Sequence, residues 1–235
     1  MAGLITVLRR TALPAMVLVA AVAAGCGSTE TVTVTTTVTQ TVTTTTPAAK
    51  KTVRVYFMRD GKVGPVARAL GQVDRASLLA AVATGPTDAE RAIGFTQGEA
   101  TERTAEEVYT LSQFDPKKPV EVAGKSYRRA DFEDLTPAIL VESPLPFAAV
   151  SSPLRVWGTA NTFEATFEYE LLDAAGKALA KHFVTATSGS GTRGTWDISI
   201  RFASPGGPGK LVVYELSAAD GSRIHQVEIP LSLSR

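Results

Sequence analysis

The sequence has very little cysteine, histidine or net charge: one cysteine, two histidines and a formal charge of +1 in 235 residues. A single cysteine excludes an intramolecular disulfide, so the fold must be stabilised by apolar packing. His182 and His225 lie far apart in the chain, and no second cysteine is present to join them, which argues against a zinc site. We therefore expect neither a metal nor any other cofactor.

Long apolar runs are scarce as well. Residues 13–24 form a run of about a dozen residues, short of the ~20 that a membrane-spanning helix needs. Arg9 and Arg10 precede this run, and Gly25 and Cys26 follow it. A basic start, a short apolar run and small residues before the cut are typical of a secretory signal peptide. A cysteine directly after the small residues matches the site at which bacterial lipoproteins are cleaved and acylated, and the sequence resembles that class.

We predict that residues 1–25 are a lipoprotein signal peptide and that Cys26 carries fatty acyl chains such as palmitate. Each buried methylene contributes ~0.8 kcal/mol, so two or more chains hold a protein firmly on a membrane. The predicted location is therefore extracytoplasmic, on the cell membrane. Two alternatives remain open: an uncleaved signal anchor, and an ordinary secretory signal whose cysteine is incidental.

Neither sign of charge dominates the mature chain. Residues 1–25 contain two arginines and no acid, so their removal leaves 22 basic and 23 acidic side chains. A protein that binds nucleic acid electrostatically needs a concentrated basic face. We therefore expect no nucleic-acid partner.

Residues 26–51 are rich in threonine and valine and contain no large apolar side chain. Alternating threonine and valine have strand propensity. A segment without large apolar side chains nevertheless buries too little surface to offset the entropy of ordering. We predict that this segment is a disordered tether between the membrane and the folded part.

Residues 52–134 are predicted to form a small α+β domain. Residues 52–58 alternate in polarity, and the turn pair Asp60-Gly61 separates them from a second short run at 63–66. This pattern indicates a β-hairpin. A helix is expected to begin after Asp74, a capping residue, and to end before the Gly-Pro pair that follows Thr84.

A second helix is predicted at residues 104–114. Thr104 is expected to cap it, and Glu107, three residues on, to complete a capping box, with apolar residues at helical spacing behind them. A last short strand is expected at 119–122. Residues 125–129, KSYRR, are expected to form a solvated basic loop.

Residues 138–235 show short strand patterns separated by turns every 8 to 12 residues, which predicts an all-β antiparallel sandwich of immunoglobulin-like form. In the run 163–172, apolar side chains alternate with Glu164, Glu168 and Glu170, whose face is expected to be solvated. The expected core includes the two tryptophans and two aromatic residues of that run: Trp157, Trp196, Phe167 and Tyr169.

Three motifs of the first segment carry a family resemblance: VYFMRDGK at 55–62, LLAAVATGPTDAER at 78–91 and VYTLSQF at 108–114. With them the segment resembles the sporulation and spore-germination domain called GerMN. That family has a longer stretch with two further strands where this chain has only residues 95–103, so the resemblance implies an abridged domain. GerMN-like folds resemble ring-building motifs of sporulation channels, which implies self-association as an alternative function.

The second segment carries SPLP at 143–146, VSSPL at 150–154, VWGTAN at 156–161 and FEATF at 163–167. It resembles the immunoglobulin-like domain of bacterial spore-germination proteins. The order of lipoprotein signal, tether, GerMN-like domain and sandwich is similar to that of envelope lipoproteins. This resemblance implies an interaction module outside the cytoplasm and implies no reaction.

Candidate catalytic residues are few. Ser151 and Ser152 have no histidine or acid placed to activate them as nucleophiles. The acidic cluster of Asp131, Glu133 and Asp134 is the one candidate for a wall hydrolase, which requires an acidic pair in a cleft. We expect the protein not to be an enzyme.

The leading hypothesis is a noncatalytic, lipid-anchored envelope protein that presents two interaction domains to an envelope protein or a cell-wall component, connected with sporulation or germination. The alternative is a ring-forming or assembly subunit of an envelope complex. The sequence assigns no binding residues, and Cys26, the predicted lipidation site, is the one site residue that it names.

Overall fold

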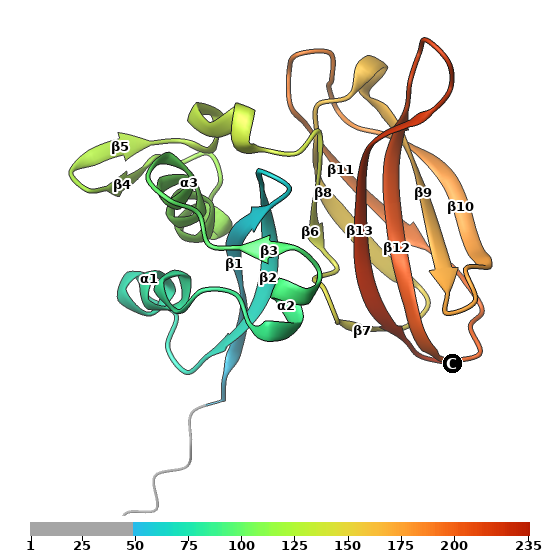
Figure 1. The fold of residues 1–235 in the computed structure, drawn as a ribbon, viewed down its shortest axis with the longest axis horizontal. Helices are drawn as coiled ribbons and strands as arrows, with labels where there is room; N and C mark the ends of the chain where they lie inside the picture. The colour runs from blue at the N-terminus through green and yellow to red at the C-terminus, as the bar shows by residue number, and fades with distance from the viewer. Residues whose placement is uncertain (1–48) are drawn as a thin grey trace, which may run out of the picture. The chain divides into compact units, whose positions relative to one another are not determined.

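The folded chain begins with a long β-hairpin (Figure 1). In the computed structural model, which describes residues 49–235, β1 (Lys51–Arg59) and β2 (Lys62–Leu70) pair antiparallel in an unbroken register. The connecting Asp60 and Gly61 have φ of 52° and 72°, the positive values that a tight hairpin turn of this kind requires. The predicted hairpin is therefore confirmed, with a second strand longer than expected.

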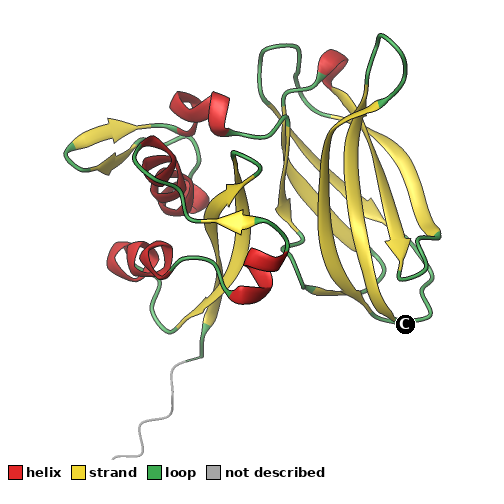
Figure 2. Ribbon diagram, viewed as in Figure 1, coloured by secondary structure: helices red, strands yellow, loops and turns green. Residues whose placement is uncertain are grey.

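Helices pack on this hairpin, as Figure 2 shows. α1 (Arg75–Thr84) begins where Asp74 accepts a hydrogen bond from the Ser77 amide and ends at Gly85, whose φ is 77°. Both ends agree with the sequence prediction. α2 (Asp88–Ala92) follows, and β3 (Phe95–Thr96) then adds a short strand to the free edge of β1.

The predicted start of the next helix was wrong. α3 (Thr101–Leu111) begins three residues before Thr104, whose hydroxyl donates to the Ala100 carbonyl from inside the first turn. The buried carboxylate of Glu106 accepts the Gly98 amide at 2.7 Å and also the Met58 amide of β1, so a contact with a distant strand fixes the chain before the helix. A capping box does form, but at Thr87 and Glu90 of α2.

Side chains of α3 and the turn after it cover the edge of β1 that β2 leaves free. The amides of Met58, Tyr56 and Arg54 donate to Glu106 Oε1, Thr110 Oγ1 and Gln113 Oε1 at 3.2, 3.0 and 2.9 Å. Residues spaced by four and three share one helix face, and alternate strand residues share one edge, so the two patterns match. On this edge, where β3 pairs only with Met58 and Arg59, these amides are thereby satisfied by side chains.

The first segment ends in a hairpin and a helical turn. β4 (Val120–Val122) and β5 (Lys125–Tyr127) pair antiparallel, and a 3-10 helix spans Arg129–Leu135. The prediction of a solvated loop at 125–129 is confirmed in part: Lys125, Ser126 and Arg128 are exposed, but Lys125–Tyr127 form a strand and the Arg129 side chain is largely buried.

The rest of the chain forms two antiparallel sheets, as predicted for a β-sandwich. The first has the order β11-β8-β6 and contains β6 (Ile139–Ser143), β8 (Leu154–Ala160) and β11 (Gly194–Ile200). The second has the order β10-β9-β12-β13-β7 and contains β7 (Ala149–Val150), β9 (Thr166–Asp173), β10 (Ala178–Thr185), β12 (Gly207–Leu216) and β13 (Arg223–Leu233). One pairing departs from the antiparallel pattern, since β7 runs parallel to β13.

The core of the sandwich corrects one aromatic prediction. Phe167 and Trp196 are buried and meet edge to face with ring centroids 5.1 Å apart, and Tyr169 packs at the margin of the same core. Trp157 does not belong to it. Inward positions of β8 are even-numbered, from Leu154 to Ala160, so residue 157 points to the opposite face of the strand.

β6 contributes to two cores at once. Ile139 and Val141 lie in the sandwich core, whereas Leu140 packs with the first segment, against Tyr56 and Tyr109. A strand buried on both faces joins the segments without an intervening linker, and residues 49–235 belong to one compact unit.

Residues 1–48 lie outside the described part of the chain. The predictions for the signal peptide, for Cys26 and for nearly all of the tether concern those residues. Within residues 49–235, no helix is long and apolar enough to cross a membrane.

Candidate binding cavity at the junction of the two segments

A buried acid of the sandwich is held by two arginines of the first segment. Glu142, at the end of β6, is 3% exposed. Its Oε1 accepts a hydrogen bond from Arg129 Nη1 at 2.5 Å, and its Oε2 lies 3.2 Å from Arg54 Nε. Two cations around one carboxylate, with water largely excluded, tie β6 to β1 and to the 3-10 helix at residue 129.

Aromatic rings surround these arginines. The Arg54 guanidinium lies 4.7 Å from the ring centre of Trp157, and that of Arg129 lies 4.6 Å from the ring centre of Tyr109. This explains the outward position of Trp157, because its ring covers the junction as a cation–π partner. Burial raises the pKa of the nearby Tyr56 hydroxyl far above its ordinary value.

A second ion pair joins the segments at the other end of β6. Arg193 binds both carboxylate oxygens of Glu133 at 2.9 Å, and the Asn161 amide donates to the same carboxylate at 2.9 Å. Burial opposes ionisation of Glu133, but these hydrogen bonds hold its pKa below the usual value. Asn161 also accepts the Gly191 amide, so its side chain fastens the neighbouring loop.

The acidic cluster expected from the sequence does not assemble. Glu133 is occupied by Arg193, whereas the Asp131 carboxylate accepts the Arg128 amide at 2.7 Å. Asp134 is exposed, and its carbonyl accepts a hydrogen bond from Lys62 at 2.5 Å. These three residues therefore stabilise the junction and its 3-10 helix, and they do not meet in a cleft.

Between the segments lies a cavity of about 360 Å³. It opens where the tip of the β1–β2 hairpin faces two strand edges of the sandwich, those of β6 and β13. Its volume falls within the range of small-molecule and peptide sites. The walls come from β1, β2 and β3, from residues 137–141 and Pro146, and from residues 225–229 of β13. Its apolar walls include Val63, Pro65, Phe95, Leu140 and Val227.

The polar groups of the cavity are few and convergent. Arg59 Nη1 donates to the Glu228 carbonyl at 2.7 Å, and the guanidinium lies 5.6 Å from the ring centre of Phe95. Lys62 is bonded to a carbonyl, and the Glu228 carboxylate is paired with Lys210 at 2.8 Å. The lining therefore contains two cations that donate to backbone carbonyls, Arg59 and Lys62, together with two acids, Asp60 and Glu228.

The histidines lie apart, as the sequence indicated. His182 is exposed on β10, and His225, at the rim of the cavity, bonds Glu215 through Nδ1 at 2.8 Å. Within the part of the chain from residue 49 onward, no group of three or more histidine, cysteine, aspartate or glutamate side chains is placed to hold a metal ion.

The prediction of a solvated glutamate face was wrong for Glu170. Glu170 is 9% exposed, and its carboxylate accepts hydrogen bonds from the Tyr214 hydroxyl at 3.0 Å and from Arg223 at 2.6 Å. Lys181 pairs with both Glu168 and Glu170. Tyr214 is fully buried beneath these charges, so this outer sheet face carries an ion-pair network.

Sequence reasoning missed the cavity. Arg59, Asp60, Gly61 and Lys62 were recognised as a hairpin turn, but no motif indicates that this turn faces residues 225–229, which lie far away in the chain. Arg59 and Lys62, the two cations that flank the turn, were the one feature of the sequence that could have indicated a binding site there.

A family model described as the immunoglobulin-like domain of bacterial spore germination matches residues 138–222. The resemblance inferred for this part of the second segment is thus confirmed. The crystal structure of CopC from Methylosinus trichosporium OB3b matches at 14% identity and a TM-score of 0.26, covering 39% of this chain and 87% of that chain. A similarity this low carries no argument about function. No curated protein matches the chain.

Proposed function

We propose that this protein is a lipid-anchored, noncatalytic binding protein of the bacterial cell envelope and that the junction cavity is its ligand site. The observation that carries the proposal is the cavity itself: about 360 Å³, mostly apolar, with a few polar groups directed into it. A concave apolar site with convergent polar groups is the usual form of a binding site.

The anchor is supported by the N-terminal sequence. Arg9 and Arg10, the short apolar run and Cys26 after Gly25 form the pattern of a lipoprotein signal. On this proposal, Cys26 holds the protein at the outer side of the cell membrane, and residues 26–51 separate the anchor from the folded part.

A connection with spore germination is supported by the family-model match over residues 138–222. We extend it to residues 52–134 as an abridged, GerMN-like α+β domain, on the strength of the motifs at 55–62, 78–91 and 108–114. The partner is then an envelope protein or a cell-wall component.

A noncatalytic role is supported by what the acidic side chains do. Glu133 forms an ion pair with Arg193. Glu142 forms ion pairs with Arg54 and Arg129. These pairs hold the two segments together. A rigid junction suits presentation of one fixed binding surface.

Two measurements in intact cells test the proposal. Metabolic labelling with a palmitate analogue is expected to label the protein and to fail for Cys26→Ala. A photo-crosslinking amino acid placed at Val227, in the cavity, is expected to capture an envelope component, whereas the same group at Ala174, an exposed turn residue, is not. Absence of the lipid label contradicts the anchor, and identical capture from both positions contradicts the site.

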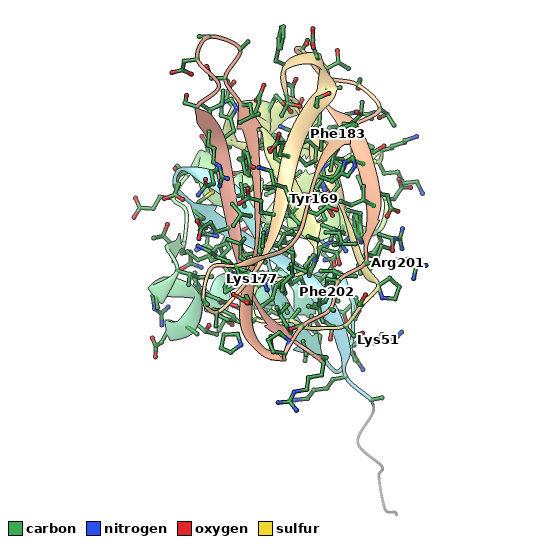
Figure 3. All side chains as sticks on the ribbon, turned by 90° about the vertical axis from the view of Figure 1, so that its right-hand side faces the viewer. Lys51, Tyr169, Lys177, Phe183, Arg201 and Phe202 are labelled. Carbon is green, nitrogen blue, oxygen red and sulfur yellow. The ribbon has the colours of Figure 1, made fainter. Side chains whose placement is uncertain are left out.

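Self-association is a second candidate, favoured by the edge strand β10. Phe183 is 60% exposed on this strand, and Figure 3 labels it in the view that faces β10. An edge strand with an exposed aromatic residue is a template for strand pairing between copies. Analytical ultracentrifugation tests self-association. We expect a concentration-dependent dimer that Phe183→Lys abolishes. A wild-type protein that is monomeric at all concentrations contradicts this candidate.

A further inference from the structure

We infer that the junction cavity takes a short extended peptide that carries an apolar side chain and a carboxylate, and that this peptide pairs as a strand with the free edge of β13. The inference rests on the proposed function and specifies the chemical class of its ligand.

The direction of the backbone groups on β13 follows from three hydrogen bonds. The carbonyls of Glu228 and Pro230 accept from Arg59 Nη1 and from the Phe147 amide, both at 2.7 Å, and the Ser232 amide donates to Ala148 at 3.0 Å. All three residues are even-numbered, so even-numbered residues of β13 direct their backbone groups away from β12. Val227, in between, pairs with Val213 of β12.

The Glu228 amide and the Gln226 carbonyl lie on this edge, and among residues 49–235 no hydrogen bond joins either of them to a group outside the β12–β13 ladder. They flank Val227, which lines the cavity. One ligand residue opposite Val227 can donate to the Gln226 carbonyl and accept from the Glu228 amide, which is the bonding pattern of a parallel ladder. β7 already pairs parallel with β13 further along, at Ser232 and Leu233. The ligand therefore continues a strand position that the fold has begun.

The walls specify the side chain. Phe95, Val63, Pro65 and Leu140 surround a volume of about 360 Å³, which accommodates a bulky apolar side chain with its backbone. A plain hydrocarbon fits the walls but forms no hydrogen bond with the amide and carbonyl of β13, whereas a peptide strand does.

The cations at the hairpin tip specify the charge. Arg59 has a single, long contact with an acid, 4.0 Å from Nε to Asp60, whose carboxylate is 91% exposed. Lys62 donates to the Asp134 carbonyl. The acid nearest to them on β13, Glu228, is already paired with Lys210. A ligand carboxylate can therefore form charge-assisted hydrogen bonds with Arg59 and Lys62, neither of which is paired with a buried acid.

The test is isothermal titration calorimetry of the full-length protein with N-acetylated Ala-Val-Ala, Ala-Leu-Ala and Ala-Phe-Ala, each as the free acid and as the C-terminal amide. At least one free acid is expected to bind, and its amide to bind about tenfold more weakly, since the amide cannot form charge-assisted hydrogen bonds. If none of the free acids binds at millimolar concentration, the inference is wrong.

Two matched pairs of variants locate the site. Glu228→Pro removes the edge amide, and Pro230 shows that the same edge of this strand accommodates proline. It is expected to weaken binding about tenfold through the lost hydrogen bond, whereas Glu228→Ala, which keeps the amide, is expected to bind nearly as well as the wild type. Arg59→Ala is expected to weaken binding of the free-acid peptide and to leave binding of the amide unchanged. Arg201→Ala, at an exposed arginine, is the control and is expected to change neither affinity.

Failure of the inference and failure of the proposed function give different results. Binding that is unchanged in both Glu228→Pro and Arg59→Ala overturns the peptide inference. Specific crosslinking from Val227 in cells, together with no peptide binding, also overturns the inference but leaves the proposed cavity function standing. Thermal melts of each variant show whether a loss of binding reflects unfolding, and Arg59→Ala keeps the test decisive if Glu228→Pro does not fold.

Discussion

Nη1 of Arg129 and Oε1 of Glu142 lie 2.5 Å apart in a junction where both side chains are largely buried, 11% and 3% exposed. Burying such a pair costs desolvation free energy, which good geometry and further hydrogen bonds must offset. Here Arg129 also donates to the Ser112 hydroxyl and the Tyr109 carbonyl. The relation between the two segments is therefore set by a specific polar contact as well as by the apolar packing of β6.

Glu142→Gln is expected to destabilise the protein strongly, by about 3–5 kcal/mol, since it leaves two buried guanidinium groups without a counter-charge. The matched control is Asp197→Asn, which breaks the exposed pair with Arg155 on β8 and is expected to change stability little. Urea denaturation followed by tryptophan fluorescence measures both. Equal effects of the two substitutions contradict a stabilising role for the junction pair.

Glu106 predicts a pH dependence of stability. Burial raises the pKa of its carboxyl group to about 7, and backbone amides of Gly98 and Met58 partly oppose the rise. Because the folded-state pKa exceeds that of an unfolded glutamate, this group stabilises the fold fully below the unfolded pKa. That contribution is lost as the pH rises from about 4.5 through about 7.

Unfolding free energies measured from pH 5 to pH 8 are therefore expected to fall more steeply in the wild type than in Glu106→Gln, which keeps an acceptor for the two amides but does not titrate. Glu107→Gln, which removes one charge from the same helix, is the control and should retain the wild-type slope. A slope that Glu106→Gln leaves unchanged assigns the pH dependence to other groups.

Thr110→Val tests the cover of the β1 edge. Valine has nearly the shape of threonine but cannot accept the Tyr56 amide, which then lies buried without a partner. The expected loss is about 1–3 kcal/mol of unfolding free energy. The control is Thr104→Val, on the solvent side of the same helix, which is expected to change the free energy of unfolding by no more than about 0.5 kcal/mol. Hydrogen exchange at the Tyr56 amide should accelerate only in the first variant.

Gly158→Ala tests how closely β6 and β8 approach. A Cβ atom at this position meets the Leu140 carbonyl oxygen and carbon, the latter 3.0 Å away, so the strands must separate. We expect a loss of about 1–3 kcal/mol, as for other overpacked sites, and weaker pairing of Glu142 because it follows on the same strand. Gly71→Ala, which has open space around it, should be neutral. Thermal melts that do not distinguish the two contradict this packing.

Elements with local causes could be predicted from the residues alone. The Asp60-Gly61 turn, the helix that Asp74 caps and Gly85 ends, and the alternating strands of the sandwich follow from turn geometry, capping and a period of two. Phe167 and Trp196 were assigned to the core correctly for the same reason, since their strands alternate cleanly.

Features that depend on partners distant in the chain could not be predicted in this way. Trp157 was misassigned because its face of β8 is covered by Arg54 from another segment, a partner that the local pattern does not indicate. The start of α3 was missed because Glu106 binds the Met58 amide of β1 as well as the Gly98 amide. The burial of Arg129 was missed because its guanidinium lies over the ring of Tyr56, a residue of β1. The cavity also depends on distant partners, because it lies where the hairpin tip meets β13. The contact that forms it stabilises the fold only when both stretches are present, so neither stretch predicts it alone.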